Sequence, residues 1–278
     1  MTVMQMRQKD VIDIEYDWNN KIKIGCRERN YTVSYFLIST AVLLVCSLWY
    51  LDIDWGKIIA RMPDVGIIFY KLAHFEGKYG DLIILSMMET ISITILSTLY
   101  SVVLGLFFGM LAAENIFKVR WLSIFVQSLF TFLRAVPTPI WVLMMMVCMG
   151  MGPSAGIAGL CVHTTAFFTR AFAQSFENIP EETLEAIETT GVNKLGVFFN
   201  AVLPAALSQL IAWIAMRFEI NFSECAILGM IGAGGIGFVI SKSIQSYEYG
   251  TAGAAIFLVF LFAYTIERIF VLIKAKIR

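Results

Sequence analysis

Charged residues are scarce in this chain of 278 residues, and most kinds of catalytic or metal site have no candidates in it. Only 15% of the residues are charged and the mean hydropathy is +0.74, whereas about a quarter of the residues in a soluble domain are charged. The 21 basic and 21 acidic residues cancel, which excludes a globally basic nucleic-acid-binding protein. There are two histidines, and the five cysteines show no C-x-x-C or Cys/His spacing, so no metal site is predicted.

Nucleotide-binding and catalytic motifs are also missing. The sequence contains no Walker A motif, G-x-x-x-x-G-K-[ST], and no nucleophile–base set that would support an intramembrane enzyme. Residues 232–237, GAGGIG, do fit the dinucleotide-binding pattern G-x-G-x-x-G, but they follow an apolar helical stretch instead of a strand. We therefore interpret Gly232, Gly234, Gly235 and Gly237 as a tight bend or a close helix contact.

Long apolar runs are what the chain has in abundance. The first run, residues 33–51, carries no charge and is long enough to cross a bilayer core of about 30 Å at about 1.5 Å per residue. It ends in Trp49 and Tyr50, which suit a membrane interface better than the exit of a signal peptide. The runs predict an all-α integral membrane protein with six transmembrane helices, at residues 33–51, 82–113, 121–150, 155–175, 205–230 and 250–273.

Basic residues in the short polar segments set the predicted topology. Residues 1–32, the turn FKVR and residues 274–278 are basic, and six crossings place all three on the cytoplasmic side under the positive-inside rule. Residues 52–81 then form an extracytoplasmic segment. The five-helix core occupies residues 82–273, and its one long polar loop, residues 177–204, faces the cytoplasm.

The loop at residues 177–204 reads as two short helices separated by a glycine. Pro180 is followed by two glutamates, which suits a helix start because acidic groups are favoured at the positive end of the helix dipole. Gly191 interrupts the pattern, and apolar residues recur on both sides of it. Such a loop is too polar for lipid and too regular for a linker, so we expect it to dock into a groove on a cytoplasmic partner.

The same loop resembles the EAA signature of the membrane subunits of ATP-binding-cassette importers, which reads E-A-A, three residues, G, nine residues, I-x-L-P. The residues that fall on this pattern are Glu185, Ala186, Gly191, Leu203 and Pro204. Ile187 and Ala201 depart from it, and both remain apolar. The resemblance implies that the matching residues couple this chain to an ATPase. It also implies a type I importer permease fold, with one N-terminal helix before the five-helix core.

A wider resemblance covers residues 82–273. The segments ETISITILSTLYSVVLGLFFGMLAA, RAVPTPIWVLM, GPSAGIAGLCVHTTAFFTRAFAQSFENI and RFEINFSECAILGMIGAGGIGFVI look like the phosphonate-type permease. This implies a translocation path for phosphonates, or for phosphate- and phosphite-like anions. The related methionine-type permeases share ETISIT, RAVP and GAGGIG, so a permease for methionine or another small solute is the alternative. A secondary transporter or channel is the alternative of another class, and it would not need the loop at 177–204.

The resemblance also implies which partners and cofactors the chain works with. An ATPase subunit pair would bind ATP and Mg²⁺, and the chain itself would hold no cofactor and have no enzymatic activity of its own. A second permease chain, identical or not, would line the path, and an extracytoplasmic binding protein would deliver the substrate. The expected location is the lipid of a bacterial plasma (inner) membrane, with both termini cytoplasmic and no nucleic acid bound.

Ionisable residues inside the predicted spans are candidates for the path, because each is costly in lipid unless it faces protein or water. Arg217, Asn221 and Glu224 share one helix face at spacing i, i+4, i+7, and Glu219 lies on a neighbouring face. The guanidinium fork matches phosphate oxygens, which favours Arg217 as a substrate contact. Pairing with a glutamate, so that Arg217 only joins helices, stays open as the alternative.

Arg134 is the second arginine proposed for the path. It lies about halfway along the third predicted span, just before Pro137 and Pro139. Neither proline nitrogen can donate a hydrogen bond, so the helix is expected to break there and its freed backbone groups need a polar neighbour. Glu89, the one charge within the second span, is expected to reach the headgroup region.

Overall fold

The computed structural model describes residues 31–75, 79–117, 119–189 and 191–277, and every regular element within these ranges is helical. Contacts divide the chain into two units, Met1–Met62 and Pro63–Arg278. In the first unit, α1 (Tyr31–Tyr50) coincides with the first predicted span. The predicted N-terminal segment, up to residue 30, lies outside the described residues.

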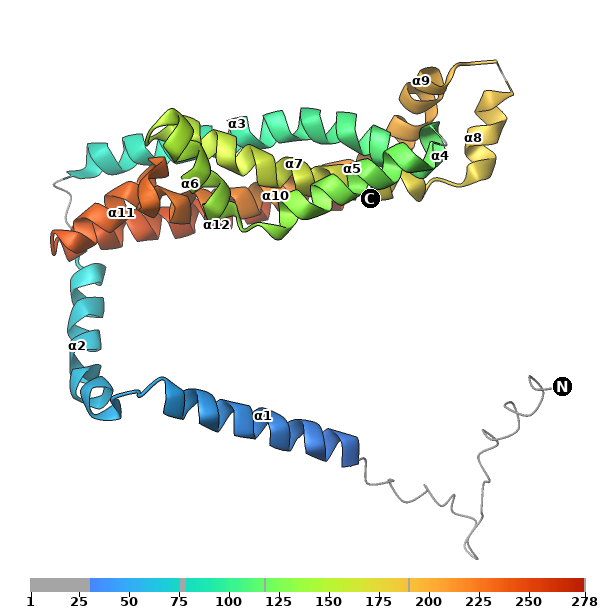
Figure 1. Ribbon diagram of the computed structural model, residues 1–278. Helices are drawn as coiled ribbons and strands as arrows, with labels where there is room; N and C mark the ends of the chain where they lie inside the picture. The colour runs from blue at the N-terminus through green and yellow to red at the C-terminus, as the bar shows by residue number, and fades with distance from the viewer. Residues whose placement is uncertain (1–30, 76–78, 118, 190, 278) are drawn as a thin grey trace, which may run out of the picture. The chain divides into compact units, whose positions relative to one another are not determined.

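The second unit is a helix bundle in which α7 is central, because it contacts α3, α5, α6 and α10 (Figure 1). The long helices are α3 (Gly80–Ala112), α5 (Arg120–Ala135), α6 (Thr138–Met149), α7 (Pro153–Glu177), α10 (Leu203–Leu228), α11 (Ile236–Gln245) and α12 (Tyr249–Ile277). The short elements are α4 (Glu114–Phe117), α8 (Glu181–Glu188), α9 (Lys194–Val197) and the π-helical turns η2 (Phe198–Val202) and η3 (Gly229–Ala233). Figure 1 shows α4, α8 and α9 at one end of the bundle, here called the α8 end, and α6 and α11 toward the other, the α11 end.

The third predicted span is a broken helix. α5 and α6 meet at an angle of 88°, and Pro137 stands at the start of α6 with a φ of −58°. The break frees backbone carbonyls at the end of α5, and Trp141 compensates by donating its Nε1–H to the carbonyl of Leu133 at 3.0 Å. The prolines therefore lie where the helix changes direction, just after Arg134.

The number of spans follows only in part from helix length and composition. Four described helices are long and apolar enough to cross a membrane, or five if the bent pair α5 and α6 is one span. The remaining predicted span, residues 155–175, is the helix α7, whose buried face carries hydroxyl groups such as Thr164, Thr165 and Thr169. These polar groups lower its hydropathy, and neighbouring helices shield them from lipid. The count of six spans stays a prediction.

The segment at residues 52–81 contains a helix that the sequence analysis did not identify. α2 (Trp55–Ala73) is amphipathic, with Pro63 inside it. Its apolar residues recur every three or four positions, which is the signal that would have found it. The internal proline and the interspersed charges make this segment resemble an irregular loop.

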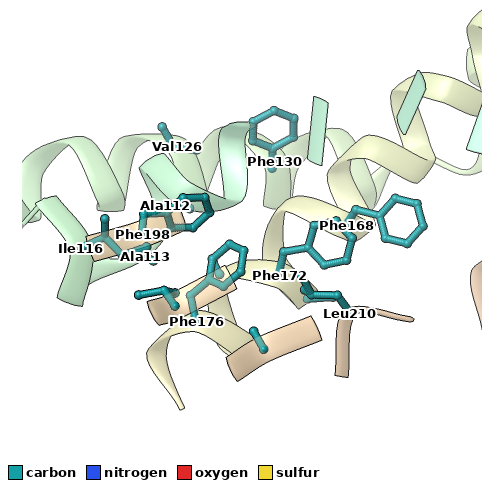
Figure 2. Packing of buried hydrophobic residues seen from close by; sticks show 14 of the residues in the cluster. Ala112, Ala113, Ile116, Val126, Phe130, Phe168, Phe172, Phe176, Phe198 and Leu210 are labelled. Carbon is teal, nitrogen blue, oxygen red and sulfur yellow. The ribbon is translucent and has the colours of Figure 1, made fainter. Parts of the chain in front are cut away.

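An aromatic cluster holds the α8 end of the bundle together. Phe168, Phe172 and Phe176 lie one turn apart on the inner face of α7 and are fully buried (Figure 2). The rings of Phe168 and Phe172 stack with centroids 4.9 Å apart, and Phe176 meets Phe198 edge-on at 5.2 Å. Because Phe198 belongs to η2, the cluster joins the loop to the central helix of the bundle.

Candidate functional site

The loop at the α8 end has the helix–glycine–helix form that its sequence predicts. α8 begins directly after Pro180, with Glu181 and Glu182 in its first turn. The chain then turns at Gly191, whose φ of +80° lies in the left-handed region that favours glycine. A Cβ atom at this position would meet no other atom within 4 Å, so the backbone angle alone requires glycine.

One face of this loop is fixed to the bundle. Leu184 on α8, together with Val197 and Phe198, is buried in the cluster at the α8 end. Lys194 donates its Nζ–H to the carbonyl of Phe117 at 3.1 Å, which joins α9 to the end of α4. A displacement of α8 and α9 would therefore be passed to α4 and α7.

The residues that match the EAA pattern lie on the outer side of this loop and at its exit. Glu185 and Ala186 are exposed on α8, whereas the preceding residue Leu184 is buried. Leu203 is half-buried and Pro204 is exposed in the first turn of α10, which continues directly from η2. The structure gathers these residues at one end of the bundle.

Two apolar side chains of the same loop also face outward. Leu195 is 47% exposed and Phe199 is 59% exposed, and they stand one helical turn apart. The loop therefore presents two apolar side chains outward at the α8 end.

A polar network surrounds Arg217 about halfway along α10. The guanidinium is buried, and its Nη2 lies 3.2 and 3.4 Å from the two carboxylate oxygens of Glu224. Nη2 also lies 3.0 Å from Nδ1 of His163 on α7. Because arginine stays protonated, the guanidinium donates and His163 accepts, which leaves the ring proton on Nε2. The hydroxyl of Thr164 accepts from both Nε and Nη2 at 3.4 Å.

Asn221 extends this network to α3. It is fully buried, it accepts a hydrogen bond from Thr164 at 2.9 Å, and it donates one to Thr98 at 2.9 Å. Asn221 therefore ties α3, α7 and α10 together and positions Thr164 under Arg217. Glu219 lies outside the network, since it forms no ion pair with any residue that the structure describes.

A cavity of about 560 Å³ opens beside this network, between α5, α7 and α10. Its lining residues are Gln127, Arg134, Phe167, Arg170, Ala171, Ala173, Gln174, Glu177 and Trp213. Arg134 is exposed in it and has no carboxylate partner within the described part of the chain. Arg170 donates to the hydroxyl of Thr131 at 3.3 Å. The cavity therefore carries two arginines and two glutamine amides beside one carboxylate, that of Glu177.

Phe167 is the contact between the cavity and the buried network. The guanidinium carbon of Arg134 lies 5.5 Å from the centre of its ring, and that of Arg217 lies 5.6 Å from the same centre. Both separations are within the range of cation–π attraction. The structure thus brings the two arginines singled out from the sequence to one aromatic ring.

The sequence analysis missed the contribution of α7 to this site. His163, Thr164 and Phe167 all contact Arg217, and none of them was selected from the sequence as a site residue. Their spacing of i, i+1 and i+4 puts them near one face of α7. That spacing was a usable signal, but it gives no indication of which helix lies opposite.

The glycine-rich segment forms a sharp turn between η3 and α11. Gly234 and Gly235 have φ angles of +84° and +71°, which favour glycine. Glu89 on α3 accepts the backbone N–H of Gly235 at 3.0 Å, and the Thr90 hydroxyl accepts that of Ile236 at 2.8 Å. The carboxylate of Glu89 therefore binds the start of α11, and its position in the headgroup region stays a prediction.

The sequence was compared with models of known protein families. Residues 105–278 match the family of binding-protein-dependent transport system inner membrane components. The chain belongs to this family. It is thus a membrane permease subunit of an ATP-binding-cassette importer, and the cavity and every network residue except Thr98 lie within the region that matches.

Curated relatives of this permease include two transport proteins for phosphorus oxyanions. The phosphate-import permease protein PhnE of Mycolicibacterium smegmatis is 28% identical over 215 residues, which cover 77% of this chain and 40% of that protein. The phosphite transport system permease protein PtxC of Stutzerimonas stutzeri is 28% identical over 226 residues, which cover 81% of both chains. The permease therefore spans less than half of the first relative and four-fifths of the second.

Solved structures support the fold of the permease. An inward-facing structure of the MetNI methionine ABC transporter superposes with a TM-score of 0.65 at 22% sequence identity. The superposition covers 73% of this chain and all of that chain. The all-α type I importer fold expected from the sequence is therefore confirmed.

Proposed function

We propose that this permease carries phosphorus oxyanions, namely phosphonates, phosphate or phosphite, through the membrane. The observation that carries the proposal is the similarity to PtxC, which extends over 81% of the chain and of the relative. PhnE, a relative named for phosphate import, points to the same class of solute.

The arginines near the cavity support an anionic substrate. Arg134 is exposed to the cavity without a carboxylate partner in the described part of the chain, and Arg170 lines the same space. Arginine binds tetrahedral oxyanions through parallel N–H donors, so a phosphonate passing Arg134 would gain charge-assisted hydrogen bonds. Arg217, Asn221, Glu219 and Glu224 on α10 would form the wall beyond Phe167.

The outer face of the loop at the α8 end is the proposed docking site for an ATPase subunit pair. Glu185 and Ala186 on α8 would contact the ATPase directly, Gly191 would set the angle between α8 and α9, and Leu203 with Pro204 would pass the movement into α10. ATP and Mg²⁺ would be bound by the ATPase. This arrangement puts the loop and both chain termini in the cytoplasm.

Two further partners follow from the same proposal. A second permease chain would close the path on the side of the cavity. An extracytoplasmic binding protein would deliver the oxyanion at the α11 end.

The proposal is tested by uptake into proteoliposomes that contain the complete transporter with its binding protein. ATP-dependent uptake of radiolabelled phosphite, phosphate or methylphosphonate is expected, with no uptake of methionine. Uptake of methionine alone would contradict the anion assignment. Uptake that proceeds without the ATPase, driven by an ion gradient, would contradict the importer mechanism itself.

A further inference from the structure

The ion pair between Arg217 and Glu224 is loosely made. Both carboxylate oxygens of Glu224 approach the same nitrogen, Nη2, at 3.2 and 3.4 Å. A strong guanidinium–carboxylate pair instead uses two nitrogens and two parallel bonds of about 2.7–2.9 Å. Glu224 therefore neutralises Arg217 without occupying its fork.

Part of the Arg217 guanidinium remains available. Nε and Nη2 donate to Thr164, and Nη2 also contacts His163. Nη1 forms no hydrogen bond with any residue in the described ranges, although it carries two N–H donors. An oxyanion at Nη1 would find donors that nothing else in this part of the chain uses.

The two partners differ in how firmly they are held. The Arg217 side chain is 6% exposed and is fixed by two residues of α7, whereas the Glu224 side chain is 25% exposed and contacts the network only through Arg217. A buried cation within a membrane needs an anion near it at all times. Glu224 is the partner that is free to turn away, provided that another anion takes its place.

Arg217 lies close to the cavity that the proposed substrate would enter. The guanidinium carbons of Arg134, which is exposed in the cavity, and of Arg217 both lie within 5.6 Å of the centre of the Phe167 ring. The two arginines therefore share one aromatic neighbour, and an anion held at Arg134 would lie near Arg217.

We propose that Glu224 is a resident counter-ion that competes with the transported oxyanion for Arg217. This inference rests on the proposed function, since it requires an anionic substrate. When no substrate is present, Glu224 holds the charge of Arg217. An arriving oxyanion displaces it, and the returning carboxylate releases the oxyanion again. Glu224 thereby selects for solutes with net negative charge and prevents the site from trapping them.

The decisive experiment compares the wild-type permease–ATPase complex with the Glu224→Gln variant in nanodiscs. The binding protein is left out, because it would set the apparent affinity. Phosphite is titrated by calorimetry, and the melting temperature is measured with and without it. We expect the variant to bind phosphite about fivefold more tightly, the effect of removing about 1 kcal/mol of competition. Without anion its melting temperature falls below that of the wild type, and saturating phosphite restores it.

Two variants serve as controls. Glu267→Gln makes the same chemical change on α12, and its phosphite affinity should equal that of the wild type. Glu224→Asp keeps the charge but shortens the side chain. If Glu224→Gln does not fold, Glu224→Asp is titrated with phosphite in its place, and tighter binding than in the wild type is again the expected result.

Two results would overturn the proposal. One is an unchanged or weaker phosphite affinity in Glu224→Gln, and the other is a lowered melting temperature that phosphite does not restore. Both describe a residue that only joins helices. Either result leaves the proposed function intact as long as the wild-type transporter takes up phosphorus oxyanions, so the two proposals fail separately.

Discussion

Arg134 differs from the other arginine at Phe167 in having no counter-ion in the described part of the chain. It lies in the last turn of α5, and the proline break that follows changes the direction of the backbone. This side chain is therefore the cation of the cavity that is most open to a passing anion.

We predict that Arg134→Gln lowers the rate of phosphite uptake by about tenfold, because about 1.4 kcal/mol of charge-assisted binding is lost. Arg134→Lys should recover only part of the rate, since an ammonium group lacks the planar fork. Uptake into proteoliposomes at saturating ATP is the measurement. Arg120→Gln, at the opposite end of α5, is the matched control and should retain the wild-type rate. Full activity of Arg134→Gln would remove this residue from the path.

Glu89 has a structural role that can be tested separately. Its carboxylate accepts the Gly235 N–H at 3.0 Å at the start of α11. Glu89→Ala should lower stability by about 1 kcal/mol, as the loss of a helix cap does, and the melting temperature by about 2–4 °C. Glu89→Gln retains an acceptor oxygen and should melt close to the wild type. Equal losses in both variants would mean that the negative charge, and not the hydrogen bond, is what matters.

The residues of the site were predictable within one helix but not between helices. The spacing of Arg217, Asn221 and Glu224 gave their common face, because helical periodicity is a local property. Their partners Thr164 and Thr98 come from helices that are distant in sequence, and no single-sequence pattern states which helices become neighbours. The role of Glu89 was missed for the same reason.

The loop at the α8 end depends on one backbone angle. Gly191 has a φ of +80° and donates its N–H to the carbonyl of Glu188 at 3.0 Å. Proline can supply neither the positive φ nor the hydrogen bond, because its φ is fixed near −65° and it has no N–H. We predict that Gly191→Pro abolishes ATP-driven uptake and leaves membrane insertion intact.

The control for this prediction uses the tolerance of asparagine for left-handed angles. Gly191→Asn should keep at least half of the wild-type uptake, since a side chain at this position has open space around it. Membrane insertion is followed by fractionation and uptake by radiolabelled phosphite. Wild-type transport by Gly191→Pro would show that the angle between α8 and α9 is not part of the coupling.

The outward face of η2 offers a second test of the loop. Phe199 is exposed beside Leu195, whereas its neighbour Phe198 is buried in the cluster. Phe199→Asp should abolish co-purification of the ATPase, because a carboxylate would be desolvated within the contact. Tyr247→Asp, an equally drastic change at an exposed residue beyond α11, should leave co-purification unchanged. Normal recovery of the ATPase with Phe199→Asp would place the docking surface elsewhere.

Helices that lie in long apolar runs were predicted well, and helices in segments that mix polar and apolar residues were predicted poorly. α3 and α12 follow their hydrophobic segments closely, since burial in lipid requires a continuous apolar run. α2 was missed because Pro63 and scattered charges interrupt its amphipathic pattern. The π-helical turn η2, directly before α10, was not predicted. At the other end of α10 the chain kinks at Gly232, whose φ of +113° lies in the region that favours glycine.

In the second unit as a whole, α7 connects the proposed coupling end with the proposed path. Phe176 contacts η2, and Phe168 and Phe172 continue the same buried face along the helix. The next turns of α7 carry Thr164 and His163, which hold Arg217. If the loop does couple to an ATPase, a shift of it would reach the arginine through one helix, because α7 contacts both sites.

The six-span arrangement requires α7 to cross the membrane although its composition alone would not select it as a span. Its polar groups are buried against α3 and α10, so a crossing α7 exposes few of them to lipid.

We predict that the residues before and after α7 lie on opposite sides of the membrane. Single cysteines at Met151 and Thr189, both exposed, test this in a cysteine-free background with a membrane-impermeant maleimide. Met151→Cys should react in intact cells, and Thr189→Cys only after permeabilisation. Reaction of both in intact cells would reduce the number of spans to five and move the α8 loop outside the cell, away from any ATPase.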